Sequence, residues 1–356
     1  MALKDLRKNI DNIDSEILKL LNKRTDFALK IGSIKKSKGM GSYVPNRETE
    51  VIDRIIKNNK GPFPNNGLIA VYRELMSATR FLEKPIKVAY MGPEATFSHL
   101  AALKKFGRSV NYSPVKTIRD VFEEVERKRV DYGVVPIENS IEGVINYTLD
   151  MFVESNLKIY GEILLEVSLN LLSNFPIKSI RNIFSHPQPY AQSRNWLENN
   201  LPGIPLVETV STTQAALMAQ KNKYTAAIAS ELAGQMYGLK TIAKNIEDYP
   251  HNFTRFLVIK DSSCERTGHD KTSLVFSVKD RVGALHNILS PFAKHKINLT
   301  KIESRPSRKK AWDYIFFVDF QGHKDDKKVA LCLSKVSDQC NLIKILGSYP
   351  DAKIKN

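Results

Sequence analysis

The chain has few of the residues that mark metal-binding, disulfide-bonded or membrane-spanning proteins. Its 356 residues include only three cysteines, with no metal-ligand spacing and no disulfide framework. Apolar runs stay far below the ~20 residues of a membrane span, and the charged residues from Lys4 onward do not fit a signal peptide. The sequence also lacks a glycine-rich dinucleotide fingerprint, a phosphate-binding loop and an assignable Ser-His-Asp set. We therefore expect a cytoplasmic protein that uses no metal, no cofactor and no covalent catalysis.

The positive charge is placed at the two ends of the chain. The net charge is +16, but residues 85–262 carry 19 basic and 18 acidic side chains and are nearly neutral. Residues 1–84 carry 17 and 10, and residues 263–356 carry 18 and 10. No basic stripe with interleaved aromatics, zinc pattern or recognition helix accompanies the charge, so we do not expect nucleic acid as a partner. A small anionic substrate explains the first excess better, and the last can be a solvated surface.

Residues 1–84 carry the pattern of three helices. Apolar residues recur at three- and four-residue spacing to about Lys38, which predicts a first helix of ~50 Å at ~1.5 Å per residue. Further helices are expected from Arg47 to about Asn59 and from about Leu68 to Glu83. A helix this long is not covered by an 84-residue monomer, so we expect an intertwined homodimer.

Two cations of the first helix return to nearly one face. Arg24 and Lys35 lie eleven residues apart, whereas Arg7 lies seventeen residues before Arg24 and ~25 Å away along the axis. The copy of Arg7 in a dimer partner could still reach a ligand held by Arg24. Solvated surface cations remain the alternative.

Residues 85–262 alternate short apolar strands with helical stretches, which is typical of a mostly parallel sheet. Strands that end near Met91, Val135, Phe184, Val210 and Ala229 each run into hydroxyl or amide residues before an expected helix. Such turns cap helices and can hold anions through free N–H groups. His186 is interpreted as a turn residue rather than a ligand. Five such turns predict a cleft with neutral donors, suited to a substrate that carries carboxylates.

The stretch Asn252–Phe256 places an amide, a hydroxyl and a guanidinium just before the apolar run Leu257–Ile259. Taken alone, an ordinary exposed strand edge explains it. After a linker at 262–268, residues 271–350 show the pattern βαββαβ, a ferredoxin-like α+β unit. No acid–base set occurs in it, so we expect it to bind rather than react.

Residues 1–84 resemble the all-helical chorismate mutase domain, through Leu20-Leu21-Asn22-Lys23-Arg24, Ile31-Gly32, Lys35 and Arg47-Glu48. The resemblance implies that chorismate is rearranged to prephenate in one site, with Arg7 coming from the partner chain. It assigns catalysis to Arg7, Arg24, Lys35, Glu48 and Glu83, and substrate binding to Arg47 and Thr79. Val44 replaces an aspartate common in the family, which puts one hydroxyl contact in doubt. Glu83 would have to be protonated to donate to the ether oxygen.

Residues 85–262 resemble prephenate dehydratase, with two α/β lobes like those of periplasmic binding proteins. The matching blocks are 90–98, 131–143, Ser185-His-Pro-Gln188 and Asn252-Phe-Thr-Arg-Phe256. The resemblance makes Thr254 the donor to the departing hydroxide. Candidate substrate contacts are Thr96, Ser98, Asn139, Ser140, Thr212 and Arg255. For Arg255, bracing of the loop is the alternative to carboxylate binding, and we favour it.

Residues 271–350 resemble the ACT regulatory domain. The resemblance implies L-phenylalanine as effector, held between paired domains by Gly283, Ala284 and Leu285, with Glu303, Ser304, Arg305 and Pro306 at the interface. The full pattern predicts a bifunctional mutase and dehydratase with domains at 1–84, 85–262 and 271–350. Three alternatives stay open: a dehydratase that prefers arogenate, a non-catalytic sensor of aromatic acids, and a C-terminal domain that only dimerises.

Overall fold

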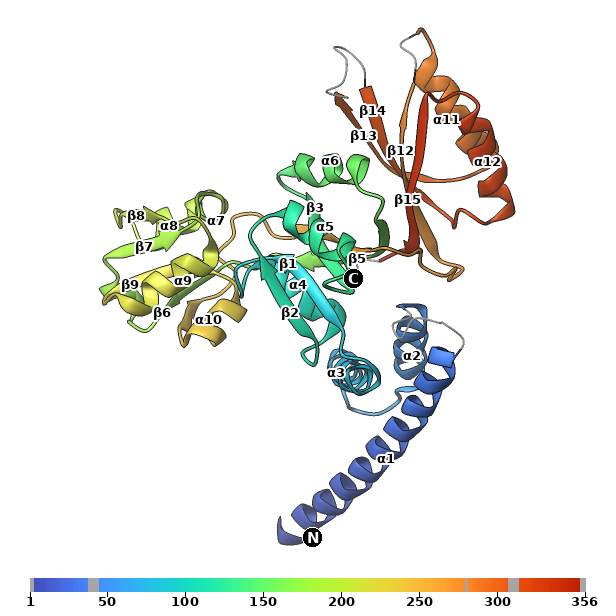
Figure 1. The fold of residues 1–356 in the computed structure, drawn as a ribbon. Helices are drawn as coiled ribbons and strands as arrows, with labels where there is room; N and C mark the ends of the chain where they lie inside the picture. The colour runs from blue at the N-terminus through green and yellow to red at the C-terminus, as the bar shows by residue number, and fades with distance from the viewer. Residues whose placement is uncertain (1–2, 38–44, 279–280, 307–313, 353–356) are drawn as a thin grey trace. The chain divides into compact units, whose positions relative to one another are not determined.

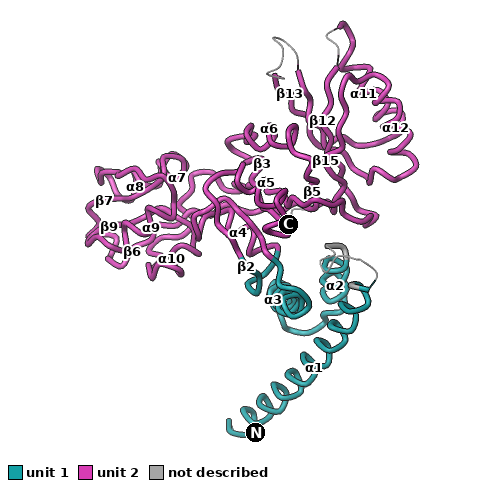
Figure 2. Tube along the Cα trace, in the orientation of Figure 1, with its two compact units in different colours: residues 1–86, 106–111 teal, residues 87–105, 112–356 magenta. Residues whose placement is uncertain are grey.

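The computed structural model describes residues 3–37, 45–278, 281–306 and 314–352. The chain divides into two compact units (Figure 2). Unit 1 contains residues 1–86 with 106–111, and unit 2 contains residues 87–105 with 112–356. Each unit is described below by itself.

Unit 1 consists of helices in its described part: α1 (Leu3–Ser37), α2 (Pro45–Asn58) and α3 (Asn65–Glu83). The three predicted helices are therefore confirmed, and the 35 residues of α1 span ~52 Å. Most of the apolar side chains of α1 that defined its periodicity remain 47–66% exposed, among them Leu6, Ile13 and Ile34, whereas Leu21 is partly buried. None of the described helices is long and apolar enough to cross a membrane.

The first lobe of unit 2 is built on one sheet (Figure 1). The strand order is β2-β1-β3-β11-β5, and a short strand β4 pairs with β3. The strands are β1 (Lys87–Met91), β2 (Asn111–Val115), β3 (Tyr132–Asn139), β4 (Gly143–Val144), β5 (Lys158–Glu166) and β11 (Phe253–Lys260). Its helices are α4 (Phe97–Phe106), α5 (Ile118–Glu126) and α6 (Asn146–Glu154). Buried side chains such as Phe122 and Phe152 form its core.

The second lobe holds a sheet of order β10-β6-β9-β7-β8. Its strands are β6 (Asn170–Ser173), β7 (Asn182–Ser185), β8 (Leu206–Glu208), β9 (Thr225–Ala229) and β10 (Lys240–Ala243). Its helices are α7 (Pro187–Gln192), α8 (Arg194–Asn200), α9 (Thr212–Lys221) and α10 (Glu231–Tyr237), with a 3-10 turn at Ile177–Ser179. The chain enters this lobe after β5 and returns to the first after β10. The predicted two-lobed α/β architecture is confirmed.

Two details of that prediction are wrong. The sheets are mixed rather than mostly parallel, because β11 runs antiparallel to both β3 and β5, and β6 antiparallel to β9 and β10. β3 also does not run into a helix. It turns at Asn139–Ser140 into β4, which pairs back onto β3, and α6 begins only at Asn146. The turns after β1, β7, β8 and β9 do lead into helices.

The C-terminal part of unit 2 is a four-stranded antiparallel sheet of order β13-β14-β12-β15. Its elements are β12 (Asp270–Ser277), α11 (Ala284–Lys294), β13 (Leu299–Pro306), β14 (Tyr314–Gln321), α12 (Lys327–Ser337) and β15 (Leu342–Pro350). Both helices cover one face of the sheet (Figure 1). The βαββαβ prediction is confirmed. Side chains of the other face, including Val275, Phe317 and Leu346, share a core with the first lobe.

Candidate functional site

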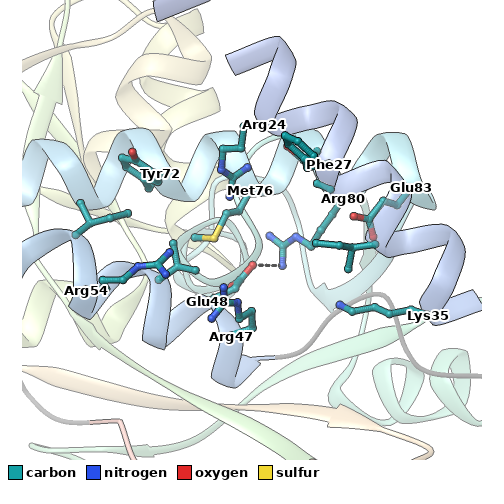
Figure 3. A pocket seen from close by; sticks show the side chains of 15 residues that line it. Arg24, Phe27, Lys35, Arg47, Glu48, Arg54, Tyr72, Met76, Arg80 and Glu83 are labelled. Atoms are coloured by element: carbon teal, nitrogen blue, oxygen red, sulfur yellow. Dashed lines mark ion pairs between the residues drawn. The ribbon is translucent and has the colours of Figure 1, made fainter. Parts of the chain in front are cut away.

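A cavity of about 410 Å³ opens among the three helices of unit 1 (Figure 3). It contains six of the predicted residues: Arg24, Lys35, Arg47, Glu48, Thr79 and Glu83. Its apolar wall includes Phe27, Val51 and Met76. The volume is in the range of small-ligand sites. A cavity lined with several cations and an apolar wall suits an anion that carries a hydrocarbon ring.

Arg80 and Arg54 also line this cavity, and the sequence reasoning missed both. Arg80 is 7% exposed, and its Nη1 lies 2.6 Å from Glu48 Oε1 (Figure 3). Its Nη2 donates to the Phe106 carbonyl at 3.0 Å. The missed signal is the spacing of α3, since Met76, Arg80 and Glu83 follow one another at four and three residues and so share a face. Arg80 therefore holds the carboxylate of Glu48 in place.

Glu83 enters the cavity close to α1. A Cβ on Gly32 would lie 2.9 Å from Glu83 Cδ, so the glycine makes room for this carboxyl group. Burial raises the pKa of Glu83 above its usual value, although nearby Lys35 and Arg80 oppose the shift. The carboxyl group therefore keeps its proton to higher pH than an ordinary glutamate.

One residue predicted for this site, Arg7, is on the exposed part of α1 and does not line the cavity. Val44 lies outside the described residues. The cavity of one chain thus brings together six of the seven mutase residues expected from the sequence.

A second constellation surrounds Thr254 at the start of β11, beside the end of β3. Thr254 and Asn139 are cross-strand partners, and Asn139 Nδ2 lies 2.9 Å from Thr254 Oγ1. The orientation of the Asn139 amide is fixed by its oxygen, which accepts from the backbone N–H groups of Ile141 (2.9 Å) and Glu142 (3.1 Å). Asn139 must then donate to Thr254. The Thr254 hydroxyl accepts this bond and keeps its own proton for another partner.

The network continues from Asn139 into the second lobe. Asn139 Nδ2 also donates to Asn252 Oδ1 (2.7 Å), and Asn252 Nδ2 donates to Gln192 Oε1 (3.2 Å). Gln192 Nε2 then donates to Glu142 Oε1 at 2.7 Å, and Gln188 donates to the other Glu142 oxygen. Gln188 and Gln192 come from α7, whereas Glu142 follows β3. A chain of amides that ends on an acceptor carboxylate joins the two lobes behind Thr254.

Sequence reasoning missed Asn252, Glu142, Gln188 and Gln192 as site residues. Three of them, Asn252, Glu142 and Gln188, stand in the blocks that carry the dehydratase resemblance, which was the available signal. Gln192 follows Gln188 by one helical turn and had no signal of its own.

The other expected contacts occupy turns between strand and helix. Thr96 Oγ1 donates to the carbonyls of Met91 (3.2 Å) or Pro93 (3.0 Å), so its hydroxyl shapes the turn after β1. Ser98 and Thr212 are buried in the first turns of α4 and α9. Ser140 Oγ accepts from Phe253 N at 2.9 Å and so ties β3 to β11. His186 caps α7 through its ring nitrogen, as the interpretation of a turn residue predicted.

Arg255 faces away from Asn139. Its guanidinium contacts Glu162 of β5 and Asp319 and Tyr349 of the C-terminal sheet. This placement supports the bracing alternative.

The strands that lead to and carry the predicted effector residues share one β14 partner at an end of the C-terminal sheet. Ile315 is the register partner of both Ser277, near Gly283, and Arg305. Gly283 has φ +78° and precedes α11, and the Ala284 amide donates to the Arg281 carbonyl at 3.1 Å. Glu303 and Ser304 lie on β13, and Pro306 ends it. Arg305 is buried and paired with Asp150 of α6 (3.3 Å). Arg305 thus contacts the first lobe rather than an open ligand site.

Among the described residues, no group of three or more His, Cys, Asp or Glu side chains could hold a metal ion.

Comparison with known proteins assigns each region. A chorismate mutase type II family model matches residues 6–84, a prephenate dehydratase model matches 88–264, and an ACT domain model matches 272–338. A bifunctional chorismate mutase/prephenate dehydratase of Aquifex aeolicus is 52% identical over 358 residues, 99% of each chain. One from Stutzerimonas stutzeri is 43% identical over 98% of each. A crystal structure of prephenate dehydratase from Arthrobacter aurescens in complex with L-Phe has 32% identity and a TM-score of 0.69, and covers 75% of this chain and 90% of that one.

Proposed function

The chain belongs to the bifunctional chorismate mutase/prephenate dehydratase family, and on that premise we propose how its residues divide the work. The enzyme rearranges chorismate to prephenate, then decarboxylates and dehydrates prephenate to phenylpyruvate, a reaction sequence of phenylalanine biosynthesis. We place the mutase in residues 1–84, the dehydratase in 85–262 and the ACT domain in 271–350. The finer assignments below are proposals about individual residues.

The mutase reaction is assigned to the cavity of unit 1. The rearrangement is pericyclic, so the catalyst must hold the chair-like conformer of a dicarboxylate and stabilise charge on the ether oxygen. Arg24, Arg47 and the partner subunit's Arg7 bind carboxylates through their bidentate forks. Lys35 and the protonated Glu83 donate hydrogen bonds to the ether oxygen. Proximity of Lys35 and Glu83 in one cavity supports this assignment.

Glu48 and Thr79 take the hydroxyl side of the substrate in this proposal. The ion pair with Arg80 keeps the Glu48 carboxylate oriented as an acceptor. Thr79 is buried in the cavity wall, and its own hydroxyl donates to the Leu75 carbonyl at 2.8 Å, which leaves the oxygen as an acceptor.

The dehydratase reaction is assigned to Thr254. Prephenate loses CO₂ and its ring hydroxyl, and hydroxide is a poor leaving group that needs a proton or a strong hydrogen bond. The observation that carries the assignment is the fixed direction of the amide network, because Asn139 donates to Thr254 and leaves the threonine O–H available. Threonine is a weak acid, so Thr254 acts as a positioned hydrogen-bond donor.

Neutral donors at helix starts hold the carboxylates of prephenate. Ser98 and Thr212 lie at such starts, where N–H groups and the helix dipole favour anions. Asn139 and Ser140 flank Thr254 and shape the site, because both Nδ2 hydrogens of Asn139 are donated to Asn252 and Thr254. Thr96 shapes the turn that presents the start of α4. Arogenate has an amino group in place of the keto group of prephenate, and a comparison of kcat/KM for the two substrates would show which one the site prefers.

Regulation and assembly complete the proposal. L-Phenylalanine inhibits the dehydratase by binding at Gly283–Leu285 between paired ACT domains, with Glu303, Ser304 and Pro306 at the interface and Arg305 paired with Asp150 of the first lobe. Co-crystallised L-Phe in the Arthrobacter aurescens dehydratase supports this choice of effector. The exposed apolar face of α1 is covered by the α1 of a second chain, which gives a homodimer, or a higher oligomer through the ACT domains. The enzyme works in the cytoplasm.

Two substitutions test the division of labour. Thr254→Val should lower turnover of added prephenate by about 10²–10⁴ and leave chorismate consumption intact. Lys35→Met should lower chorismate consumption and leave turnover of added prephenate intact. Near-normal prephenate turnover in Thr254→Val would remove Thr254 from the mechanism.

A further inference from the structure

The strands that carry the proposed dehydratase site have a second face, turned away from it. Side chains alternate along a strand, so neighbours point to opposite sides of the sheet. Thr254 pairs with Asn139 in register, and the next residues, Arg255 and Glu138, pair with each other. One step along β11 therefore leads from the reacting hydroxyl to a guanidinium on the opposite face.

That guanidinium is engaged at all three of its nitrogens. Arg255 Nε lies 2.7 Å from Glu162 Oε2, Nη1 lies 2.6 Å from Asp319 Oδ2, and Nη2 donates to Tyr349 Oη at 2.9 Å. The Arg255 side chain is 12% exposed. Glu162 belongs to the first lobe, whereas Asp319 and Tyr349 belong to the C-terminal sheet. Two of its three hydrogen-bond partners thus come from the ACT domain, and Glu138 of β3 lies 4.0 Å from Nη1 as a further ion pair.

Each partner of Arg255 is itself held. Ser273 of β12 bonds to both Asp319 Oδ1 (2.5 Å) and Tyr349 Oη (2.6 Å). Glu162 is fully buried, and its second oxygen accepts from Lys271 Nζ (2.9 Å) and from the Ala352 amide (2.8 Å). A buried charge with this many partners has little freedom to move alone, because loss of one contact leaves a charge unpaired.

The neighbouring strand is tied in the same way. Lys301 of β13 lies 2.7 Å from Glu138 Oε2, next to Asn139 on β3. Beside the contacts of Arg255 and Lys301, Leu257 and Ile137 of the first lobe pack with Phe317 and Leu346 of the C-terminal sheet in one apolar core. Both strands of the Thr254–Asn139 pair are therefore attached to the ACT sheet.

We propose that Arg255 is a positioning residue of the dehydratase and that the ACT sheet, through Asp319 and Tyr349, is part of the support that places Thr254. The proposal rests on the assignment of Thr254 as the reacting donor. Since an effector that shifts the ACT sheet shifts the partners of Arg255, this side-by-side contact is also the route of inhibition. The linker at 262–268 is then not needed to transmit the inhibition.

Tyr349→Phe is the test, because it removes one hydroxyl and keeps the ring in its core. Loss of a buried hydrogen bond should lower kcat for prephenate by about 2- to 10-fold, with KM unchanged. The ratio of the half-inhibitory phenylalanine concentration to the phenylalanine Kd measured by calorimetry should also rise. The mutase rate, measured in the same sample, should not change. Tyr132→Phe is the matched control, since Tyr132 is also buried and on β3 but bonds to Lys260 instead.

Ser273→Ala is a second, smaller change for the case that Tyr349→Phe reduces folding, and should move the same two quantities. A rise in KM with unchanged kcat in Arg255→Lys would show that Arg255 binds the substrate carboxylate, and would overturn the proposal. Values for Tyr349→Phe and Ser273→Ala equal to those of Tyr132→Phe would also overturn it.

Thr254→Val, measured in the same series, separates this test from that of the proposed function. Retained turnover in that variant removes Thr254 from the mechanism, and the positioning proposal fails with it. Lost turnover in Thr254→Val with no effect of Tyr349→Phe overturns the positioning proposal alone.

Discussion

A methyl group on Gly347 tests how closely the ACT sheet packs on the first lobe. β15 passes β5 at this residue, and a Cβ on Gly347 would lie 2.3 Å from the Ile159 carbonyl oxygen and 2.9 Å from its amide nitrogen. Real Cβ atoms essentially never come closer than 3.0 Å, so in Gly347→Ala the strands must separate by at least about 0.7 Å, the difference from 2.3 Å. Both clashing atoms are backbone, so no side-chain rotation relieves the contact.

The cost follows from overpacking, which destabilises by about 1–3 kcal/mol. At about 2–4 °C per kcal/mol for a domain of this size, Tm should fall by about 2–12 °C in thermal unfolding followed by calorimetry. Gly161→Ala on β5 is the matched control, because its Cβ would meet only the Lys105 side chain, 3.6 Å from Nζ and 3.7 Å from Cε, which are ordinary contacts. Gly347→Ala should also weaken phenylalanine inhibition. Equal Tm values for Gly347→Ala, Gly161→Ala and wild type would refute this packing.

Three further predictions concern the two sites. Because burial raises the pKa of Glu83, wild-type mutase activity should be full in acid and fall as pH rises through that raised pKa; Glu83→Gln, an amide donor at every pH, should give a flat profile of chorismate consumption. Arg80→Met removes the charged partner of Glu48, so mutase kcat/KM should fall by about 10- to 100-fold while added prephenate is still converted; an unchanged kcat/KM would mean that Glu48 needs no anchor. In Asn139→Asp the Thr254 hydroxyl donates its hydrogen to the new carboxylate and can no longer donate it to the substrate. Prephenate turnover should therefore fall by about 10²-fold or more. Normal turnover in this variant would contradict the proposed direction of the Asn139–Thr254 hydrogen bond.

Local patterns predicted the elements well. The period of apolar residues in α1 and the alternation along β12 each depend on neighbours in sequence, so helix and strand could be read directly. The end of β3 was mispredicted for the same reason. Asn139 and Ser140 have the composition of a helix cap, but Asn139 accepts from the amides of its own turn and the chain folds back as β4. Local composition does not distinguish these two outcomes.

Residues that act through distant partners were not predictable from the pattern. Arg255 and Asp319 are 64 residues apart, and Asn139 and Asn252 are 113 residues apart. Each pair is brought together by strand order and register, which follow from the whole fold. Arg80 was missed because the sequence does not show which carboxylate the side chain of a cation contacts in the fold. The resemblance to known families named Thr254, whereas the structure shows which groups hold it.

The most direct test of the account is formation of phenylpyruvate from chorismate alone, followed by ultraviolet absorbance in one cuvette, with and without L-phenylalanine. Wild type should convert chorismate to phenylpyruvate, and phenylalanine should suppress the second step. Thr254→Val should stop at prephenate. Binding of phenylalanine without any consumption of chorismate or prephenate by the wild-type chain would contradict the account and identify a sensor instead of an enzyme.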